Sequence, residues 1–146
     1  MSNKNIPDCY RGDMFFVDNS KAVTGSEQGG SRPAIIISND TGNLHSPTVE
    51  IVYLTSQEKN PLPTHVQVEC KVPSTALCES VYTVSKERLG EFIRECTPEE
   101  MEQINRALLI SIGISAPLPP NNPVEVELAV YKKLYEGLLD RLTARE

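Results

Sequence analysis

Short runs of apolar, β-branched and aromatic residues are spread over the chain from about Arg11 to Leu89. Four of these runs have the length and composition of strands: Met14–Val17, Ala34–Ile37, Val49–Leu54 and Val66–Val68. Between them stand sequences that favour turns: Gly29-Gly30, Asn39-Asp40, Gly42-Asn43 and Pro61-Leu62-Pro63. Many short strands at this spacing predict a small barrel or a strongly curved sheet.

A change of period after the strands predicts a helix that begins at about Pro98. Thr97 is suited to cap it, Pro98 to its first position, and Glu100 completes a Thr-x-x-Glu capping box. Apolar residues then follow at helical spacing, at Met101, Ile104, Leu108 and Ile112. Gly113 is suited to end the helix. We expect this helix to pack on the strands and to carry no chemistry.

A proline-rich connector, 116–123, separates this part from an amphipathic tail. Six apolar residues in the tail alternate at spacings of four and three: Val124, Leu128, Tyr131, Tyr135, Leu138 and Leu142. A helix of this length needs a partner surface. It can fold back onto its own barrel, or pair with a second subunit or another protein. We therefore expect three parts: a domain over 1–115, the connector, and a helix over 124–146.

The bulk composition is that of an ordinary globular protein, with 39% hydrophobic and 23% charged residues in 146. No apolar run approaches the ~18 residues of a membrane span, and the N-terminus has no apolar signal core. We expect a cytoplasmic protein that does not enter a membrane. The cysteines Cys9, Cys70, Cys78 and Cys96 form no Cys-x-x-Cys pair, so we expect buried free thiols and no metal.

The net charge of −6 argues mildly against a nucleic-acid partner, because phosphate contacts dominate affinity for RNA. Lys132-Lys133 is the only adjacent basic pair. Any RNA binding must therefore depend on a local patch rather than on the overall field.

The segment from Gly25 to Pro33, GSEQGGSRP, is the strongest candidate for chemistry. Its adjacent glycines let the backbone approach a ligand closely, and Arg32 stands at the entrance of a predicted strand. The planar fork of arginine suits phosphate. Taken alone, the segment also fits a solvated hairpin loop.

Several further motifs stand in register behind that loop. They are Arg11-Gly12-Asp13, the segment from Asn39 to Thr48, Thr55-Ser56, and Leu-Pro-Thr-His from Leu62 to His65. Together with Gly25–Pro33 they closely resemble the MazF/PemK family of toxin ribonucleases. The likeness covers about 100 residues, continues through Ser85–Leu89 and the helix to Gly113, and leaves out the tail.

The resemblance implies a mostly β protein with helices (α+β), a small SH3-like curved barrel of the CcdB/PemK type that works as a homodimer. It implies cleavage of single-stranded RNA at short sequences without a metal or other cofactor, and inhibition by an antitoxin. The cut would be made by the ribose 2′-hydroxyl, leaving a 2′,3′-cyclic phosphate and a 5′-hydroxyl. The catalytic pair carried over by motif is Arg32 and Thr55. The residues expected to bind RNA or support the site are Ser26, Glu27, Gln28, Ser56, Glu79 and Ser80.

The chemistry of these residues leaves the proton acceptor open. Arg32 suits charge stabilisation but not base catalysis, because guanidinium stays protonated. Glu27 is one candidate, since a carboxylate near an arginine is held ionised, and water is another. His45 and His65 are suitable by residue type, but their motif positions indicate a turn and a loop.

One segment departs from the family pattern. Where the family commonly has Glu-Gln-Ile-Arg-Thr, this chain has Ser80 for the glutamine and Tyr82 for the arginine. The first change predicts a different cut sequence. The second removes a positive charge but offers a ring that can stack on a base. Two alternatives therefore stay open: a non-catalytic binder like the gyrase-poisoning relatives, and a degenerate toxin kept for binding an antitoxin. The Gly25–Arg32 loop with Thr55 favours the ribonuclease.

Overall fold

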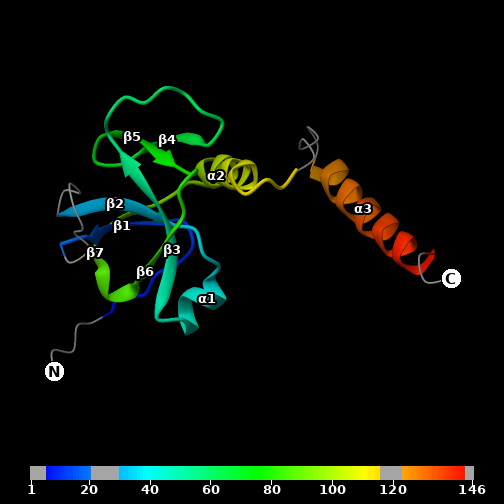
Figure 1. Cartoon of the computed structure of the whole chain (residues 1–146), viewed down its shortest axis with the longest axis horizontal. Coiled ribbons are helices and arrows are strands. Elements are labelled where there is room, and N and C mark those ends of the chain that lie inside the picture. Colours follow the sequence, from blue (N-terminus) through cyan, green and yellow to red (C-terminus); the bar gives the residue numbers. More distant parts are fainter. Residues whose placement is uncertain (1–5, 21–29, 116–122, 144–146) are drawn as a thin grey trace. The chain divides into compact units, whose positions relative to one another are not determined.

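A computed structural model describes residues 6–20, 30–115 and 123–143 (Figure 1). The chain divides into two compact units, Met1–Ser115 and Ala116–Glu146. The strands of the first unit are β1 (Asp13–Asp18), β2 (Ser31–Ile36), β3 (Thr48–Thr55), β4 (His65–Glu69), β5 (Pro73–Leu77), β6 (Tyr82–Ser85) and β7 (Leu89–Glu95). Its helices are α1 (Asp40–His45), a short 3-10 turn (Lys86–Arg88) and α2 (Pro98–Ser111). The second unit contributes α3 (Pro123–Thr143).

The strands form one antiparallel, curled sheet around β3. Along the sheet the order is β4-β5-β3-β2-β1-β7, and β6 also pairs with β3. The first half of β3 binds β6, from Thr48 to Ile51, and its last residues, Leu54 and Thr55, bind β5. In Figure 1, β3 therefore runs between α1 at one end and the β4–β5 hairpin at the other. The predicted α+β fold with a strongly curved sheet is confirmed.

Both faces of the central strand β3 pack against a core, since successive side chains of a strand point to opposite sides. On β3, Val52 and Leu54 join a cluster that includes Ile104 and Ala107 of α2. The alternate residues of β3 join a second cluster on the inner side of the curl: Val49, Ile51 and Tyr53. The apolar run of β3 is nearly continuous for this reason. A shift in its pairing would move side chains out of both clusters, so the packing of the two clusters fixes the register.

Helix α2 begins where the capping box predicts. The Thr97 hydroxyl accepts from the Glu100 N–H, and the Glu100 carboxylate accepts from the Thr97 N–H. Ile104 is fully buried, and Gly113 follows the helix with φ of 79°. Ile112, the last apolar residue of the predicted stripe, is exposed because it is already the C-cap.

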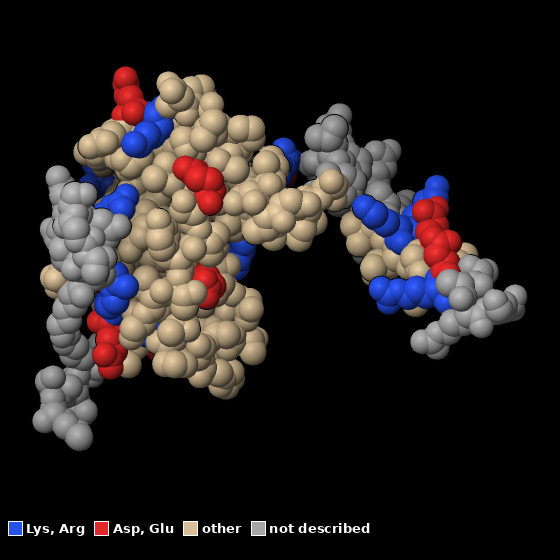
Figure 2. Space-filling view, in the orientation of Figure 1, with Lys and Arg blue, Asp and Glu red and all other residues tan. Residues whose placement is uncertain are grey.

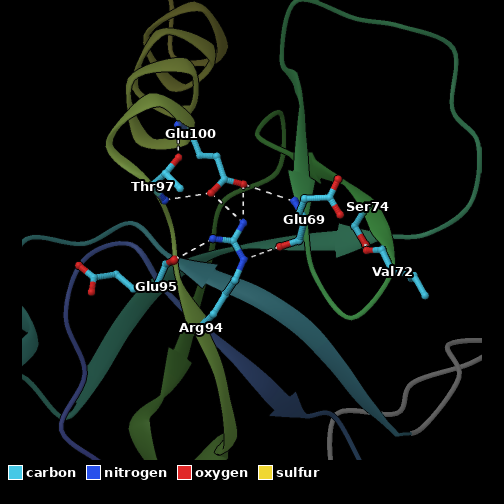
Figure 3. Close-up of polar contacts among 7 residues, drawn as sticks. All are labelled: Glu69, Val72, Ser74, Arg94, Glu95, Thr97 and Glu100. Carbon is cyan, nitrogen blue, oxygen red and sulfur yellow. Dashed lines mark hydrogen bonds and ion pairs between the residues drawn. The ribbon is translucent and has the colours of Figure 1, made fainter.

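A partly buried ion pair fastens this helix to the sheet (Figure 3). Arg94 of β7 donates to both carboxylate oxygens of Glu100, at 2.7 and 2.6 Å, and to the Glu69 carbonyl at 2.6 Å. Glu100 also accepts from the Glu69 N–H at 3.3 Å. The Glu100 carboxylate thus accepts hydrogen bonds from the N-cap of α2, from Arg94 and from the last residue of β4.

The turn predicted around Asn39-Asp40 and Gly42-Asn43 is wrong, because these residues form α1. The Asn39 side chain caps that helix by accepting from the Gly42 N–H at 2.7 Å. Asn43 is buried and hydrogen-bonds Ser38, so a side chain that often makes turns is used here to anchor a helix. The strands β5, β6 and β7 were not singled out from the sequence, because polar residues and a proline interrupt their apolar pattern.

The cysteines of the first unit are free: Cys9, Cys78 and Cys96 are buried and Cys70 is partly buried. Burial raises the pKa of Cys78 and of Cys96 to about 12, so both stay protonated thiols at neutral pH. Helix α3 carries exposed apolar side chains at Tyr131, Leu134, Tyr135, Leu138 and Leu142. No helix in the described ranges is long and apolar enough to span a membrane.

Candidate functional site

A groove of about 690 Å³ opens on the inner side of the curl, between the ends of β2 and β3, the β4–β5 hairpin and β6. The described residues that line it include four cations: Arg32, Lys59, Lys71 and Arg88. The same described lining contains no Asp, Glu or His. The groove is therefore locally basic although the net charge of the chain is −6. The sequence predicted that any RNA binding would depend on such a local patch.

Charged side chains outside the groove are mixed in sign on the face of the molecule drawn in Figure 2. On the face of the molecule in Figure 2, uncharged atoms cover most of the first unit, and the Lys and Arg side chains are interspersed with Asp and Glu. The four cations of the groove lining attract an anionic ligand locally.

Arg32 and Thr55 lie on the same side of the sheet. In the register of β2 with β3, Ala34 stands opposite Tyr53, and continuing that register by two residues sets Arg32 opposite Thr55. Side chains directly opposite in an antiparallel pair share a face. Both residues line the groove, so the structure brings together the two that the resemblance names as catalytic.

The position of Arg32 depends on an aromatic ring. Its guanidinium carbon lies 4.5 Å from the centroid of the Tyr53 ring, a distance typical of a cation–π contact. The Tyr53 hydroxyl donates to Asn19 Oδ1 at 3.0 Å, and Arg88 donates to the same oxygen. Within the described parts of the chain no carboxylate forms an ion pair with Arg32, and a guanidinium carries five N–H donors that suit a phosphate.

Thr55 is the last residue of β3, half-buried at the wall of the groove. Its hydroxyl accepts from the Gln57 N–H at 3.2 Å, which leaves the hydroxyl proton available to a ligand. Ser56 follows it and also lines the groove. The end of β3 thus contributes two hydroxyl-bearing residues to the groove that Arg32 also lines.

The chain matches the family of PemK-like, MazF-like toxins of type II toxin–antitoxin systems over residues 10–112. It is 42% identical over 110 residues to endoribonuclease EndoA of Bacillus subtilis (strain 168), a match that covers 71% of this chain and 94% of the other. The chain belongs to this toxin family.

Solved structures agree with the assignment. A mycobacterial endoribonuclease superposes with a TM-score of 0.64 at 26% identity, covering 78% of the toxin and 100% of that chain. A second, a mycobacterial endoribonuclease in complex with its cognate antitoxin, has the same TM-score at 29% identity and covers 75% of the toxin and 99% of that chain. The match to the family ends at residue 112, before the connector and α3.

The other expected site residues of the toxin lie in different places. Glu79 is not part of the groove lining: its carboxylate accepts from Thr64 Oγ1 at 3.2 Å and contacts His65 Nε2 at 3.1 Å. Burial would raise the pKa of Glu79, but its backbone, His65 and Thr64 hydrogen bonds outweigh it and lower the pKa. Ser80 is partly buried next to Glu79, also outside the lining. Ser26, Glu27 and Gln28 lie outside the described residues.

Neither histidine of the toxin reaches the groove. His45 ends α1, and the ring of His65 is held by Glu79 at the start of β4. His65 is thus the first residue of β4 rather than part of a loop, and its ring is held by Glu79 outside the groove lining.

Sequence reasoning missed Asn19, Tyr53, Lys71 and Arg88 as groove residues of the toxin. Tyr53 sits within an apolar strand and carried no sign of a site. Arg88 belongs to Ser85–Leu89, which was noted only as part of the family likeness. The sequence alone did not show which strand ends lie side by side, and that arrangement is what brings these residues into one groove.

Proposed function

We propose that this toxin is a sequence-specific endoribonuclease that cuts single-stranded RNA, mRNA included, without a metal or other cofactor. Its endoribonuclease activity follows from membership of the toxin family and from the 42% identity with EndoA. The observation that supports cleavage in this groove is the placement of Arg32 and Thr55 on one face of a cavity lined by cations.

The proposed reaction uses a nucleophile that the substrate itself supplies. The ribose 2′-oxygen attacks the adjacent phosphorus and loses its proton, and the bond from phosphorus to the 5′-oxygen of the next nucleotide breaks. That oxygen takes up a proton and leaves as a 5′-hydroxyl, while the other fragment ends in a 2′,3′-cyclic phosphate. Arg32 stabilises the charge on the phosphoryl oxygens, and the Thr55 hydroxyl donates a hydrogen bond to one of them.

The proton acceptor is proposed to come from outside the described lining, which holds no carboxylate or imidazole. Glu27, in the loop before Arg32, and a water molecule are the two candidates. The acceptor is not Cys9, because burial raises the pKa of its thiol.

We extend the proposal to the partners of the toxin. A mycobacterial relative is solved with its cognate antitoxin, and we propose that this toxin is likewise silenced by a cognate antitoxin whose extended acidic segment occupies the basic groove. We further propose a homodimer that acts in the cytoplasm, with 1–115 as the ribonuclease domain and 116–146 as an appended connector and helix.

The number of cations in the groove gives a quantitative expectation for how RNA binding depends on salt concentration. If its four described cations each contact one phosphate, the logarithm of the binding constant falls with the logarithm of salt concentration with a slope of roughly −3. A slope near zero would argue against a phosphate-binding groove.

The deciding experiment incubates the purified toxin with a long single-stranded RNA in EDTA and maps the ends. We expect discrete cuts with 5′-hydroxyl ends that vanish in Arg32→Ala. The matched control is Arg106→Ala, since Arg106 is an exposed arginine of α2 paired with Glu102, away from the groove. RNA that stays intact at high protein concentration would contradict the proposal and favour a degenerate or purely protein-binding member of the fold.

A further inference from the structure

Tyr82 is the exposed aromatic residue of the groove. Its residue is 48% exposed, whereas Tyr53, the other tyrosine of the lining, is 8% exposed. Tyr53 has its ring covered by Arg32 and its hydroxyl bound to Asn19. No hydrogen bond within the described residues involves the Tyr82 hydroxyl. Tyr82 therefore offers aromatic surface to a ligand, and Tyr53 serves as its support.

The backbone and the neighbouring ring hold Tyr82 in place. It pairs with Ile51 of β3 and so shares the inner face of the curl. Its ring meets that of Tyr53 edge to face, with centroids 5.2 Å apart at an angle of 60°. The next residue, Thr83, donates to the Glu50 carboxylate at 2.8 Å and secures β6 against β3. A ring fixed in this way loses little rotamer freedom when a ligand stacks on it.

Tyr82 is also close to the phosphate-binding arginine. Arg32 and Tyr82 contact the same Tyr53 ring, at 4.5 Å and 5.2 Å from its centroid. The distance from the Arg32 guanidinium carbon to the Tyr82 ring centre cannot exceed the sum of these two. A single nucleotide can therefore place its phosphate at Arg32 and its base at Tyr82.

We propose that Tyr82 is a base-stacking residue that receives a nucleobase flanking the phosphate held by Arg32. The inference rests on the proposed function, since it takes RNA as the ligand of the groove. Unpaired bases stack on aromatic side chains in single-strand recognition, and every base has a π-face, so the contact favours strong stackers without reading a base edge. The ligand class is thus a nucleobase of single-stranded RNA, bound together with the phosphate beside it.

The test uses short single-stranded RNA oligonucleotides screened for binding to wild-type toxin, with a 2′-deoxyribose at the cut site, where one is mapped, so that the RNA stays intact. The fluorescent base 2-aminopurine replaces each flanking base in turn. We expect wild-type toxin to quench it at one position, and Tyr82→Phe to keep the quench. Tyr82→Ala should lose the quench and bind the RNA roughly 5- to 100-fold more weakly.

Two variants separate stacking from simple packing. Tyr10→Ala removes a tyrosine that is 59% exposed and lies outside the groove lining, and it should leave both binding and quench unchanged. Tyr82→Leu keeps an apolar contact with Tyr53 and guards against misfolding; it should lose the quench while its melting temperature stays close to that of wild type.

The outcomes separate the stacking role of Tyr82 from the ribonuclease function on which it rests. Normal affinity and quench in Tyr82→Ala and Tyr82→Leu, with wild-type toxin cutting the ribose form, would overturn the stacking role alone. If wild-type toxin quenches 2-aminopurine in a way that depends on Tyr82 but does not cut the ribose form, the result would support stacking and contradict the proposed ribonuclease activity. RNA that does not bind at all would overturn both.

Discussion

The guanidinium carbon of Arg32 lies 4.5 Å from the ring centroid of Tyr53, and this contact fixes an otherwise exposed side chain at the groove. Such a cation–π contact contributes about 0.5–2 kcal/mol, depending on how well the pair is shielded from water. The Tyr53 hydroxyl is in turn bound by Asn19, which Arg88 also contacts. The charge of Arg32 is thus positioned at the groove by contact with an aromatic ring.

Replacing the ring should weaken catalysis without removing a group that touches RNA. We expect Tyr53→Leu to lower kcat roughly 2- to 30-fold, because Arg32 loses its support. Tyr53→Phe keeps the ring and loses only the bond to Asn19, so its kcat should stay near that of wild type while the free energy of unfolding falls by about 1 kcal/mol. Single-turnover cleavage and urea unfolding measure the two effects. Equal loss of kcat in both variants would show that the hydroxyl, not the ring, positions Arg32.

The Thr55 hydroxyl should act in the transition state. Thr55→Val preserves the shape of the side chain and removes the donor, so we expect kcat to fall by about 10²-fold with little change in KM. Thr55→Ser restores the hydroxyl and should recover most of the rate. Because Thr55 also accepts from the Gln57 N–H, unfolding should be followed in parallel. A Val variant with normal kcat would remove Thr55 from the catalytic pair.

Glu100 makes the stability of the first unit depend on pH. Burial would raise the pKa of Glu100, but the hydrogen bonds from Arg94, Thr97 and Glu69 outweigh it and lower the pKa below 4.5. A carboxyl whose folded pKa is depressed stabilises the protein above its unfolded pKa and loses that contribution as the pH falls through the folded value. We therefore expect Glu100→Gln to cost about 1.5–3 kcal/mol at pH 7, and the difference from wild type to shrink as the pH falls below about 4.

Glu102→Gln is the matched control for that measurement, since Glu102 forms an exposed i,i+4 pair with Arg106 on the same helix. Its cost should stay within about 0.5 kcal/mol at every pH. Denaturant titrations from pH 3 to 7 would provide both curves. A Glu100→Gln penalty that persisted unchanged at pH 3 would mean that the side chain acts through packing instead of charge.

The connector and α3 should be dispensable for folding of the first unit. That unit contains both hydrophobic clusters, and the family match ends at residue 112. We expect a chain of residues 1–115 to cut RNA at the same sites as the full toxin and to melt within a few degrees of it. Size-exclusion chromatography with light scattering on both chains tests whether the tail contributes to assembly. Loss of cleavage on truncation would assign α3 an essential role.

The local elements followed from the sequence because their causes are local. The capping box of Thr97 and Glu100 predicted the start of α2, and the apolar runs predicted the first four strands. Capping hydrogen bonds and the periodicity of side-chain burial involve residues that are close together in the chain, so they can be recognised from the sequence alone. The turn expected at Asn39-Asp40 is instead the start of α1, where the Asn39 side chain caps the helix and Asn43 is buried against Ser38.

By itself, the sequence determined the family, through motifs in a fixed order around Arg32 and Thr55, and the periodicity of the elements that carry them. Only the tertiary structure decided what surrounds Arg32. Asn19, Tyr53 and Tyr82 come from three separate parts of the chain, and they meet because the pairing of β2 and β6 with β3 sets one register for all of them. The same pairing gathers the cations of the groove in a chain of net charge −6. Composition sums charge over the whole molecule, whereas an RNA phosphate responds to the charges within a few ångströms.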